Sequence, residues 1–174
     1  MQGSFTATVT KGVIQKFTVL SKILSLMNII ELAKLNAPDI FEKGMPFDIM
    51  AGSFTLDRGI MTTGDLTVRG PAMNLSAAGD IDIRHDSIDF IVGAQVFSTI
   101  SRFIGNIPIA GNLVTGRDKS LTVGYFHVKG PYNDASVTPM PVKSISGPVL
   151  RVFRSILDIP HDLLSRGDDN DTKH

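Results

Sequence analysis

The residues that could carry out covalent chemistry are few in this sequence, and they form no known catalytic motif. No cysteine is present, which excludes disulfides, thiolate metal sites and cysteine nucleophiles. The serine-nucleophile, zinc-protease, P-loop and dinucleotide-binding patterns are also missing from the sequence. Residues 116–120 (GRDKS) resemble a phosphate-binding loop, but the second glycine before the lysine is lacking. We therefore interpret this segment as a solvated hairpin turn.

Histidine and aspartate do not form a clear metal site either. The four histidines fall on different predicted elements without metal-ligand spacing: His85, His127, His161 and His174. Since His127 alternates with Phe126 and Val128, we expect an exposed strand residue there. Four aspartates could suggest a calcium site: Asp80, Asp82, Asp86 and Asp89. A calcium cage needs about six to eight converging oxygens, which a flat strand cannot supply. We expect no metal, no cofactor and no enzymatic activity.

The composition predicts a single folded domain. The chain has 174 residues, of which 43% are hydrophobic, and its formal net charge is 0. A chain of this kind can bury a core and is not disordered. It lacks the basic surplus that nucleic-acid binding requires. We predict one domain over residues 1–165 and a polar, mobile tail over residues 166–174.

The sequence contains no predicted membrane span or signal peptide. Its longest uncharged stretch, residues 103–116, is shorter than the roughly 20 residues that a spanning helix needs. The N-terminus has no basic region followed by an apolar one. Read literally, this predicts a cytoplasmic protein. The same features are equally expected of a C-terminal part of a longer exported protein.

Hydrophobic periodicity predicts two amphipathic helices. Apolar residues recur at helical spacing from Leu20 to Ile30, which predicts a helix over residues 19–35 that ends near Pro38. A second helix is expected over residues 148–158, because Pro148 suits the first helical position and an apolar stripe follows it.

Between these helices the pattern predicts consecutive antiparallel strands. Apolar and polar residues alternate from Phe47 to Val96, with a parity change at Gly52 and a hairpin turn at residues 57–59. Further strands are expected over residues 3–9 and 121–128. The predicted fold class is mainly β (α+β): a curved antiparallel sheet of about six to eight strands that forms a groove. The two helices would lie at its edge or mouth.

The apolar face of this sheet admits two interpretations. It could form a closed core beneath the helices, which composition alone favours, or it could stay partly open and hold lipid. Alternation places the following candidate lipid-facing residues on it: Phe47, Ile49, Phe54, Leu56, Leu66, Val68, Met73, Leu75, Ile81, Ile83, Ile88, Phe90 and Val92.

Several short strand-and-turn motifs carry a family resemblance. In order along the chain they are KGMPFD (43–48), GSFTL (52–56), DRG (57–59), LTVRGP (66–71), AGDID (78–82), IPIAG (107–111) and YFHVKGP (125–131), followed by Pro139. Through their order and spacing, the chain from Val19 to Leu157 resembles the C-terminal region of AsmA-like proteins, particularly the large YhdP-type members.

This resemblance implies an envelope protein of diderm bacteria. Such proteins are anchored in the inner membrane by an N-terminal helix, which is not in this chain, and extend through the periplasm as a long β-groove that conducts phospholipid towards the outer membrane. The resemblance implies phospholipid as the ligand, and membrane association through the missing N-terminal part or the helices. An envelope protein partner fits the alternative function, a structural or protein-interaction module with a closed core. The family supplies no catalytic residues.

Overall fold

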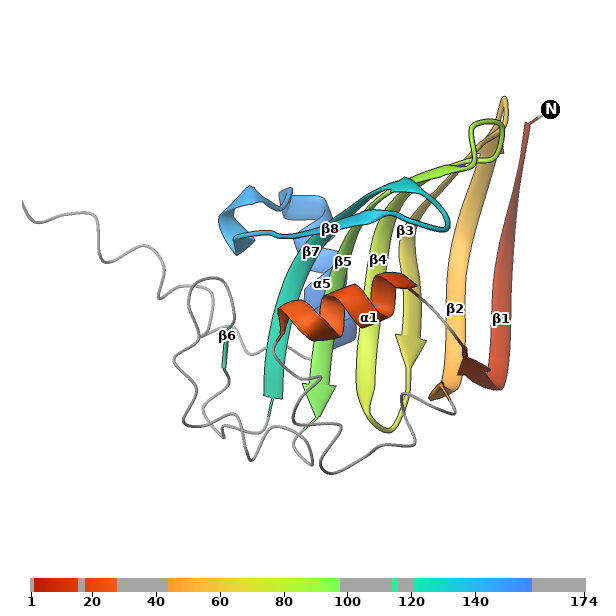
Figure 1. Cartoon of the computed structure of the whole chain (residues 1–174). Helices are drawn as coiled ribbons and strands as arrows, with labels where there is room; N and C mark the ends of the chain where they lie inside the picture. The colour runs from red at the N-terminus through yellow and green to blue at the C-terminus, as the bar shows by residue number, and fades with distance from the viewer. Residues whose placement is uncertain (1, 16–17, 28–43, 98–113, 116–120, 158–174) are drawn as a thin grey trace, which may run out of the picture.

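One antiparallel β-sheet forms most of the protein. The computed structural model describes residues 2–15, 18–27, 44–97, 114–115 and 121–157. These residues form an eight-stranded sheet in the order β1-β2-β3-β4-β5-β7-β6, with β8 paired to another part of β7 (Figure 1). The strands are β1 (Gln2–Ile14), β2 (Met45–Asp57), β3 (Ile60–Arg69), β4 (Met73–Asp82), β5 (Ser87–Phe97), β6 (Val114–Thr115), β7 (Leu121–Pro131) and β8 (Ser136–Pro139). The predicted mainly-β class and the antiparallel sheet are thus confirmed.

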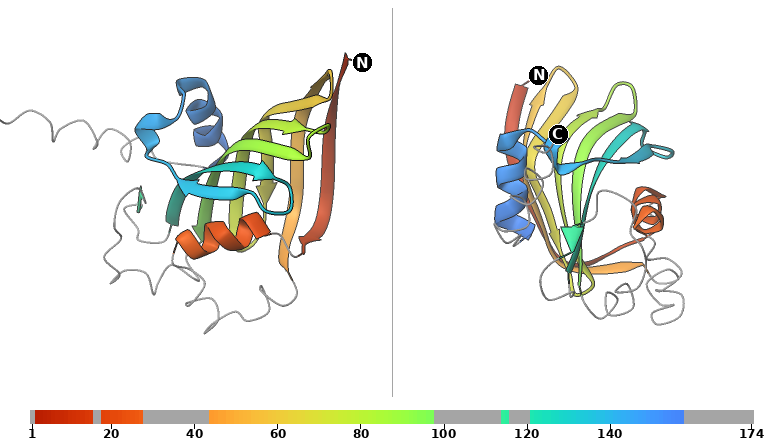
Figure 2. Two further views of the ribbon diagram at one scale, coloured as in Figure 1. Left: turned by 45° about the horizontal axis from the view of Figure 1, so that its top comes forward. Right: turned by 90° about the vertical axis from the view of Figure 1, so that its left-hand side faces the viewer.

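Two helices lie on opposite faces of the curved sheet. Helix α1 (Thr18–Leu26) lies across the concave face, called the inner face below, and α5 (Gly147–Leu157) covers the convex, outer face (Figure 2). A short 3-10 helix, η2 (Val142–Ser144), precedes α5. The helix predicted over residues 148–158 is confirmed as α5, which begins one residue earlier, at Gly147. The first helix begins as predicted, but residues 28–35 of that prediction lie outside the described residues, as do the tail and the loop at 116–120.

Side-chain alternation divides the sheet into two apolar layers. The inner layer contains the buried side of α1 and inward residues such as Phe90, Val92 and Phe126. The outer layer joins Tyr125 of β7 to Phe153 of α5, whose rings stack with centroids 6.1 Å apart. The central strands are therefore packed against α1 on the inner face and against α5 on the outer face.

Strands β1 and β2 bend sharply at one end of the sheet, and this bend changes which residues face inward. Lys11 adopts a φ of 55° there, and the Phe47 ring packs against Gly12. Phe47 is buried in the inner layer, and Met50, three residues further along β2, is partly buried against the same layer. Ile49 therefore points to the outer face, where its strand partners are Thr10 and Arg69. The expectation that Ile49 faces inward is wrong, because the side-chain parity of β2 already changes between Phe47 and Met50. The bulge expected at Gly52 is confirmed as a register shift between Ala51 and Phe54.

Candidate functional site: an apolar groove

A groove lies on the inner face, between the sheet and α1. Its volume is about 650 Å³, which falls within the roughly 300–1,000 Å³ of typical ligand pockets. Strands β2 to β5 form its base and α1 forms one wall. The lining residues are Ile14, Val19, Leu20, Ile23, Met50, Met61, Leu66, Val68, Leu75, Ala77, Ile81, Ile83, Ile88, Phe90, Val92, Val128 and Tyr132. Among the described residues that line the groove, Tyr132 is the one with a polar side chain.

Much of this lining is only partly buried. Val68, Phe90 and Val92 at the base are buried, whereas Leu75 and Ile81 on the neighbouring strand keep part of their surface accessible. Ordinary cores are packed as densely as organic crystals and leave few voids larger than a water molecule. The inner face is therefore a closed core beneath α1 and an open apolar surface beyond it.

The groove is long as well as apolar. On β4 alone it runs from Leu75 to Ile81, a distance of about 20 Å at the usual rise per strand residue. One leaflet of bilayer hydrocarbon is about 15 Å thick. An extended acyl chain would therefore fit along the strand direction.

Most of the sequence-predicted lipid-facing residues reach this groove. Eight of them line it: Leu66, Val68, Leu75, Ile81, Ile83, Ile88, Phe90 and Val92. Phe47 and Met73 also face inward, but they lie in the closed core. Leu56 faces inward beside the groove, since it pairs with the lining residue Met61 across the strands. Ile49 is the exception described above.

Phe54 extends the apolar inner face to the edge of the sheet. It pairs with Phe5 of β1, and the two rings stack with centroids 5.1 Å apart at an angle of 19°. Phe5 and Val9, which share the inward parity of β1, are both half exposed. Among the described residues, β1 pairs only with β2, so its other edge carries no partner strand. The apolar surface thus reaches a sheet edge that is open in the described part of the chain.

The alternation pattern did not identify the remaining groove residues. Val19, Leu20 and Ile23 come from α1, and their helical stripe had already indicated a buried face without showing what it covers. Met50 was missed because of the bend. Tyr132 follows the last long strand in sequence and enters the groove only through the β7–β8 turn.

Helix α1 is held over the inner face at its polar side as well. The Lys22 ammonium donates to the Ala135 carbonyl oxygen at 2.8 Å and pairs with Asp134 Oδ1 at 2.9 Å. Both acceptors belong to the turn between β7 and β8. The opposite side of α1 buries Leu24 in the inner layer, and Met27, directly after the helix, is buried there too. The wall of the groove is therefore attached by apolar packing and by one ionic anchor.

Polar side chains cluster on the outer face, away from the groove. Asp89 Oδ2 lies 2.6 Å from Lys129 Nζ, and Asp89 Oδ1 lies 2.6 Å from His127 Nε2. The hydrogen bond from Lys129 and then that from His127 hold the pKa of Asp89 below its usual value. His127 lies on a strand, as expected, and its side chain is 39% exposed and paired with Asp89. This set is an ionic group that joins the neighbouring strands β5 and β7.

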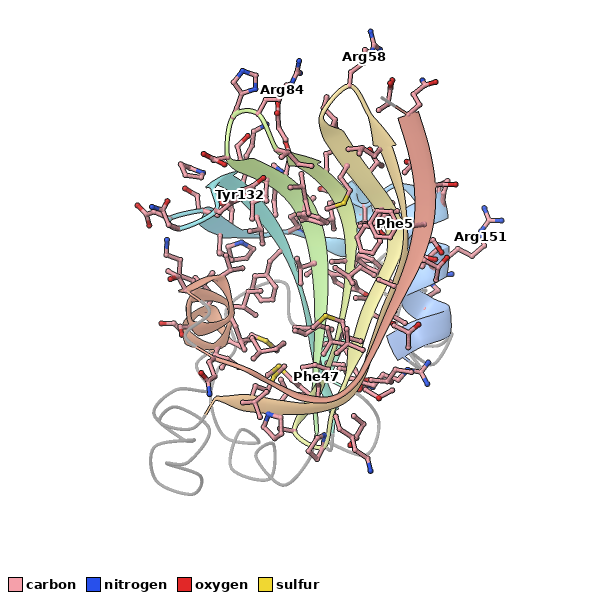
Figure 3. All side chains as sticks on the ribbon, turned by 90° about the vertical axis from the view of Figure 1, so that its right-hand side faces the viewer. Phe5, Phe47, Arg58, Arg84, Tyr132 and Arg151 are labelled. Atoms are coloured by element: carbon pink, nitrogen blue, oxygen red, sulfur yellow. The ribbon has the colours of Figure 1, made fainter. Side chains whose placement is uncertain are left out.

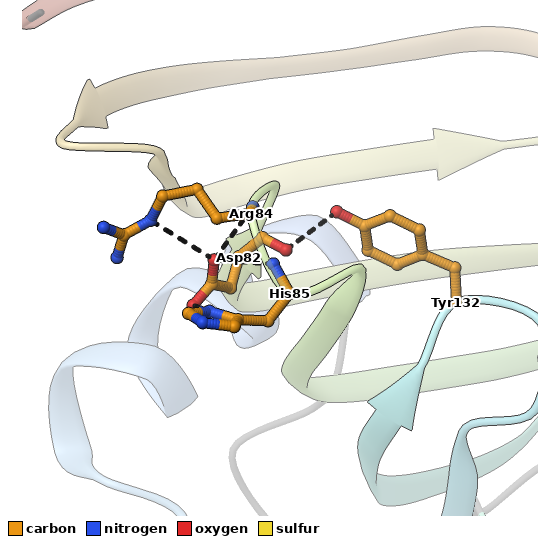
Figure 4. Close-up of polar contacts among 4 residues, drawn as sticks. All are labelled: Asp82, Arg84, His85 and Tyr132. Atoms are coloured by element: carbon orange, nitrogen blue, oxygen red, sulfur yellow. Dashed lines mark hydrogen bonds and ion pairs between the residues drawn. The ribbon is translucent and has the colours of Figure 1, made fainter.

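A second polar group closes the β4–β5 turn. Asp82 accepts hydrogen bonds from the backbone N–H groups of Arg84 and His85, and its Oδ2 lies 2.8 Å from His85 Nδ1 (Figure 4). The His85 contact is the main reason why the pKa of Asp82 is lowered. Within the described ranges, no group of three or more potential ligands could hold a metal ion.

These features define the class of protein: an open, curved antiparallel sheet with an apolar groove on its concave face. The family model described as YhdP protein matches residues 1–137, and the chain belongs to that family. The resemblance to AsmA-like, YhdP-type envelope proteins is thereby confirmed. No curated protein and no solved structure shows a significant match. Among the described residues, no helix is long and apolar enough to cross a membrane.

Proposed function

We propose that this chain holds phospholipid by its acyl chains in the groove, as one segment of an envelope protein that conducts phospholipid between the inner and outer membranes. The observation that carries the proposal is the partly accessible lining, in which Tyr132 is the one polar side chain. Family membership supports the envelope setting. The proposed role is non-catalytic.

The energetics suit transport better than tight storage. Burying one CH₂ group is worth about 0.8 kcal/mol, so a sixteen-carbon chain gains roughly 12 kcal/mol gross in a dry groove. A sealed pocket of this kind would release its lipid slowly. A groove whose described lining is apolar apart from Tyr132 lets the acyl chain slide at nearly constant free energy, because few polar groups favour one position over another.

Site-specific photo-crosslinking in cells tests this proposal. A photoreactive residue replaces Ile81 inside the groove in one strain, and Ile49 on the outer face in a matched control. Both positions are partly accessible isoleucines on strands of the same sheet. We expect phospholipid adducts at position 81 and none at position 49. Equal labelling at both positions, or none at position 81, would contradict lipid binding in the groove.

A charge placed in the groove provides the functional arm of the test. Ile81→Asp puts an unpaired carboxylate on the lipid path, which is strongly unfavourable in an apolar environment. Because Ile81 is only partly buried, the sheet of the variant should still assemble. Far-ultraviolet circular dichroism checks that its secondary structure is unchanged. We expect Ile81→Asp to abolish lipid adducts at another position in the groove, Leu75, and Ile49→Asp to leave those adducts unchanged.

A further inference from the structure

The inner face is closed at one end of the strands and open at the other. On β4, Met73 is buried, Ile81 is partly accessible, and Ile83, directly after the strand, is 50% exposed. On β5, Val96 is fully buried and Ile88 is partly accessible. Both gradients run in the same direction, because Met73 pairs with Val96 and Ile81 with Ile88. The groove therefore opens at the end where the β4–β5 turn lies.

Tyr132 stands at this open end. Its N–H donates to the Asp86 carbonyl at 3.0 Å, and its hydroxyl donates to the Asp82 carbonyl at 3.1 Å (Figure 4). Figure 3 shows Tyr132 towards one end of the sheet and Phe47 towards the other. Tyr132 lines the groove and is 41% exposed. Its ring is therefore attached to the β4–β5 turn, between the groove and water.

A phospholipid can enter such a groove in one direction. Its acyl chain gains free energy from burial against the apolar lining, whereas a charged headgroup loses its hydration when it is buried without partners. The closed end is packed with apolar side chains such as Met45 and Phe47. The terminal methyl group of the acyl chain therefore enters first, and the headgroup stays at the open end.

The charges at the open end favour a cation. Three turns joined by backbone hydrogen bonds lie there, at residues 57–60, 82–87 and 131–134, and they carry four aspartates. Asp86 has no ion-pair partner among the described residues, whereas the other three aspartates each have one. Those three ion pairs are Asp57–Arg58 at 3.3 Å, Asp82–Arg84 at 3.9 Å and Asp134–Lys22 at 2.9 Å.

The uncompensated carboxylate lies near the aromatic ring. Desolvation, and then the charge of Asp86, raise the pKa of the Tyr132 phenol. An aromatic ring attracts an ammonium group through its quadrupole, and a neighbouring carboxylate adds the attraction of an opposite charge. Ethanolamine and choline headgroups carry an ammonium group, whereas a glycerol headgroup carries none. Because this site is exposed, the preference it gives is about two- to fivefold.

We propose that the groove holds phospholipid in one orientation, with the terminal methyl group beneath α1 and the headgroup ammonium against the Tyr132 ring and the Asp86 carboxylate. This inference rests on the proposed function, since it requires that the groove holds an acyl chain. It adds the direction of the lipid and a preference for ammonium-bearing headgroups. A preference of this size selects which lipid enters without fixing the lipid in place.

Tryptophan fluorescence tests the orientation, because the natural chain contains no tryptophan. Ile83→Trp places a reporter at the open end and Leu75→Trp places one deeper in the groove. The probes are detergent-dispersed phosphatidylcholines that carry a nitroxide quencher either near the headgroup or near the terminal methyl group. We expect the first probe to quench Ile83→Trp more strongly and the second to quench Leu75→Trp more strongly.

Ile49→Trp on the outer face is the control for detergent that binds elsewhere, and neither probe should quench it. Circular dichroism checks the fold of each variant. The reverse order of quenching, or equal quenching of the two groove positions by both probes, overturns the proposed orientation.

Native mass spectrometry of the 174-residue chain measures the headgroup preference, and it starts from the natural sequence. Equal amounts of phosphatidylethanolamine and phosphatidylglycerol with identical acyl chains are supplied in detergent. We expect about two- to fivefold more bound phosphatidylethanolamine. Asp86→Asn should bring the ratio close to one. Asp57→Asn, which removes the same charge from a neighbouring turn where Arg58 pairs with it, should keep the preference.

Two variants of Tyr132 separate the ring from the hydroxyl. Tyr132→Phe keeps the ring and should keep the preference, whereas Tyr132→Leu removes the ring and should lose it. Equal binding of the two lipids by the natural chain, or a preference that survives both Asp86→Asn and Tyr132→Leu, refutes the headgroup site. Lipid that binds without preference or fixed orientation leaves the groove proposal standing. Binding of neither lipid, without adducts at position 81, refutes the groove proposal itself.

Discussion

Lys22 of α1 and Asp134 of the β7–β8 turn form an ion pair of 2.9 Å across the inner face, and the same ammonium donates to the Ala135 carbonyl at 2.8 Å. These contacts join α1, which forms one wall of the groove, to the turn between β7 and β8. They bridge residues that are more than a hundred positions apart in the sequence.

Removing this anchor should loosen α1 without unfolding the sheet. Lys22→Met deletes both contacts, and we expect a loss of about 1 kcal/mol in the free energy of unfolding. Asp134→Ala deletes only the exposed ion pair and should cost less than about 0.5 kcal/mol. Urea denaturation measures both values. Equal losses in the two variants would mean that the bond to the Ala135 carbonyl contributes nothing.

A side chain at Gly79 should disrupt the centre of the sheet. Gly79 has a φ of 155°, and a Cβ there would clash with the Asp89 carbonyl oxygen. We expect Gly79→Ala to destabilise the protein by about 3 kcal/mol or more. Gly64→Ala is the control, because a Cβ at Gly64 meets no atom within 4 Å. Its effect on the melting temperature should be neutral or slightly stabilising.

The open groove should tolerate truncation better than the closed layers do. Ile81 lines the groove and is partly buried, whereas Ile145 is 6% exposed beneath α5. Ile145→Ala should cost about 2–5 kcal/mol, as for a typical core residue, and Ile81→Ala about 1 kcal/mol or less. Comparable losses in chemical denaturation would indicate that Ile81 belongs to an ordinary core.

Asp89 should contribute to stability near neutral pH and lose that contribution in acid. Its pKa is lowered in the folded protein by Lys129 and His127, so the ionised form is favoured by folding. The contribution is complete above the unfolded pKa, close to 3.8, and disappears as the pH falls through the lowered folded value. Because the carboxylate is partly exposed, the gain is below about 1 kcal/mol.

Asp89→Asn checks this dependence. The variant should be less stable than the natural chain at pH 6, and the difference should vanish at the acid end of the titration. Asp57→Asn serves as a control on an exposed turn. A difference that persists unchanged into acid would point to packing rather than ionisation.

Tyr125 should report on the attachment of α5. Burial beneath Phe153 raises the pKa of Tyr125 to about 12, against a nearby Arg154 that lowers it. The chain has two tyrosines, so Tyr132→Phe leaves one phenol to titrate in the ultraviolet. In that background, Phe153→Leu should bring the pKa down towards 10, because the ring becomes hydrated. Arg151→Ala, on the exposed side of α5, should leave it at about 12.

The sequence by itself determined the fold class and the two faces of the sheet. Strict alternation over β4 and β5 assigned Leu75, Ile81 and Phe90 to one face, and the structure keeps them there because nothing interrupts the pleat of these strands. The turn at residues 57–59 was equally local: Arg58 and Gly59 take positive φ values of 48° and 85°, as a two-residue hairpin requires.

Only the tertiary structure decided the parity of Ile49, the extent of the groove and the meeting of Ile83 with Tyr132 at its end. The bend that turns Ile49 outward depends on Lys11 and Gly12 of another strand, and so leaves no mark in the local pattern around Ile49. An amphipathic stripe shows that α1 must bury one side, but it carries no information about how much of the sheet one short helix can cover. Ile83 and Tyr132 meet at one end of the groove because strand register brings the β4–β5 and β7–β8 turns side by side, and register is a property of the assembled sheet.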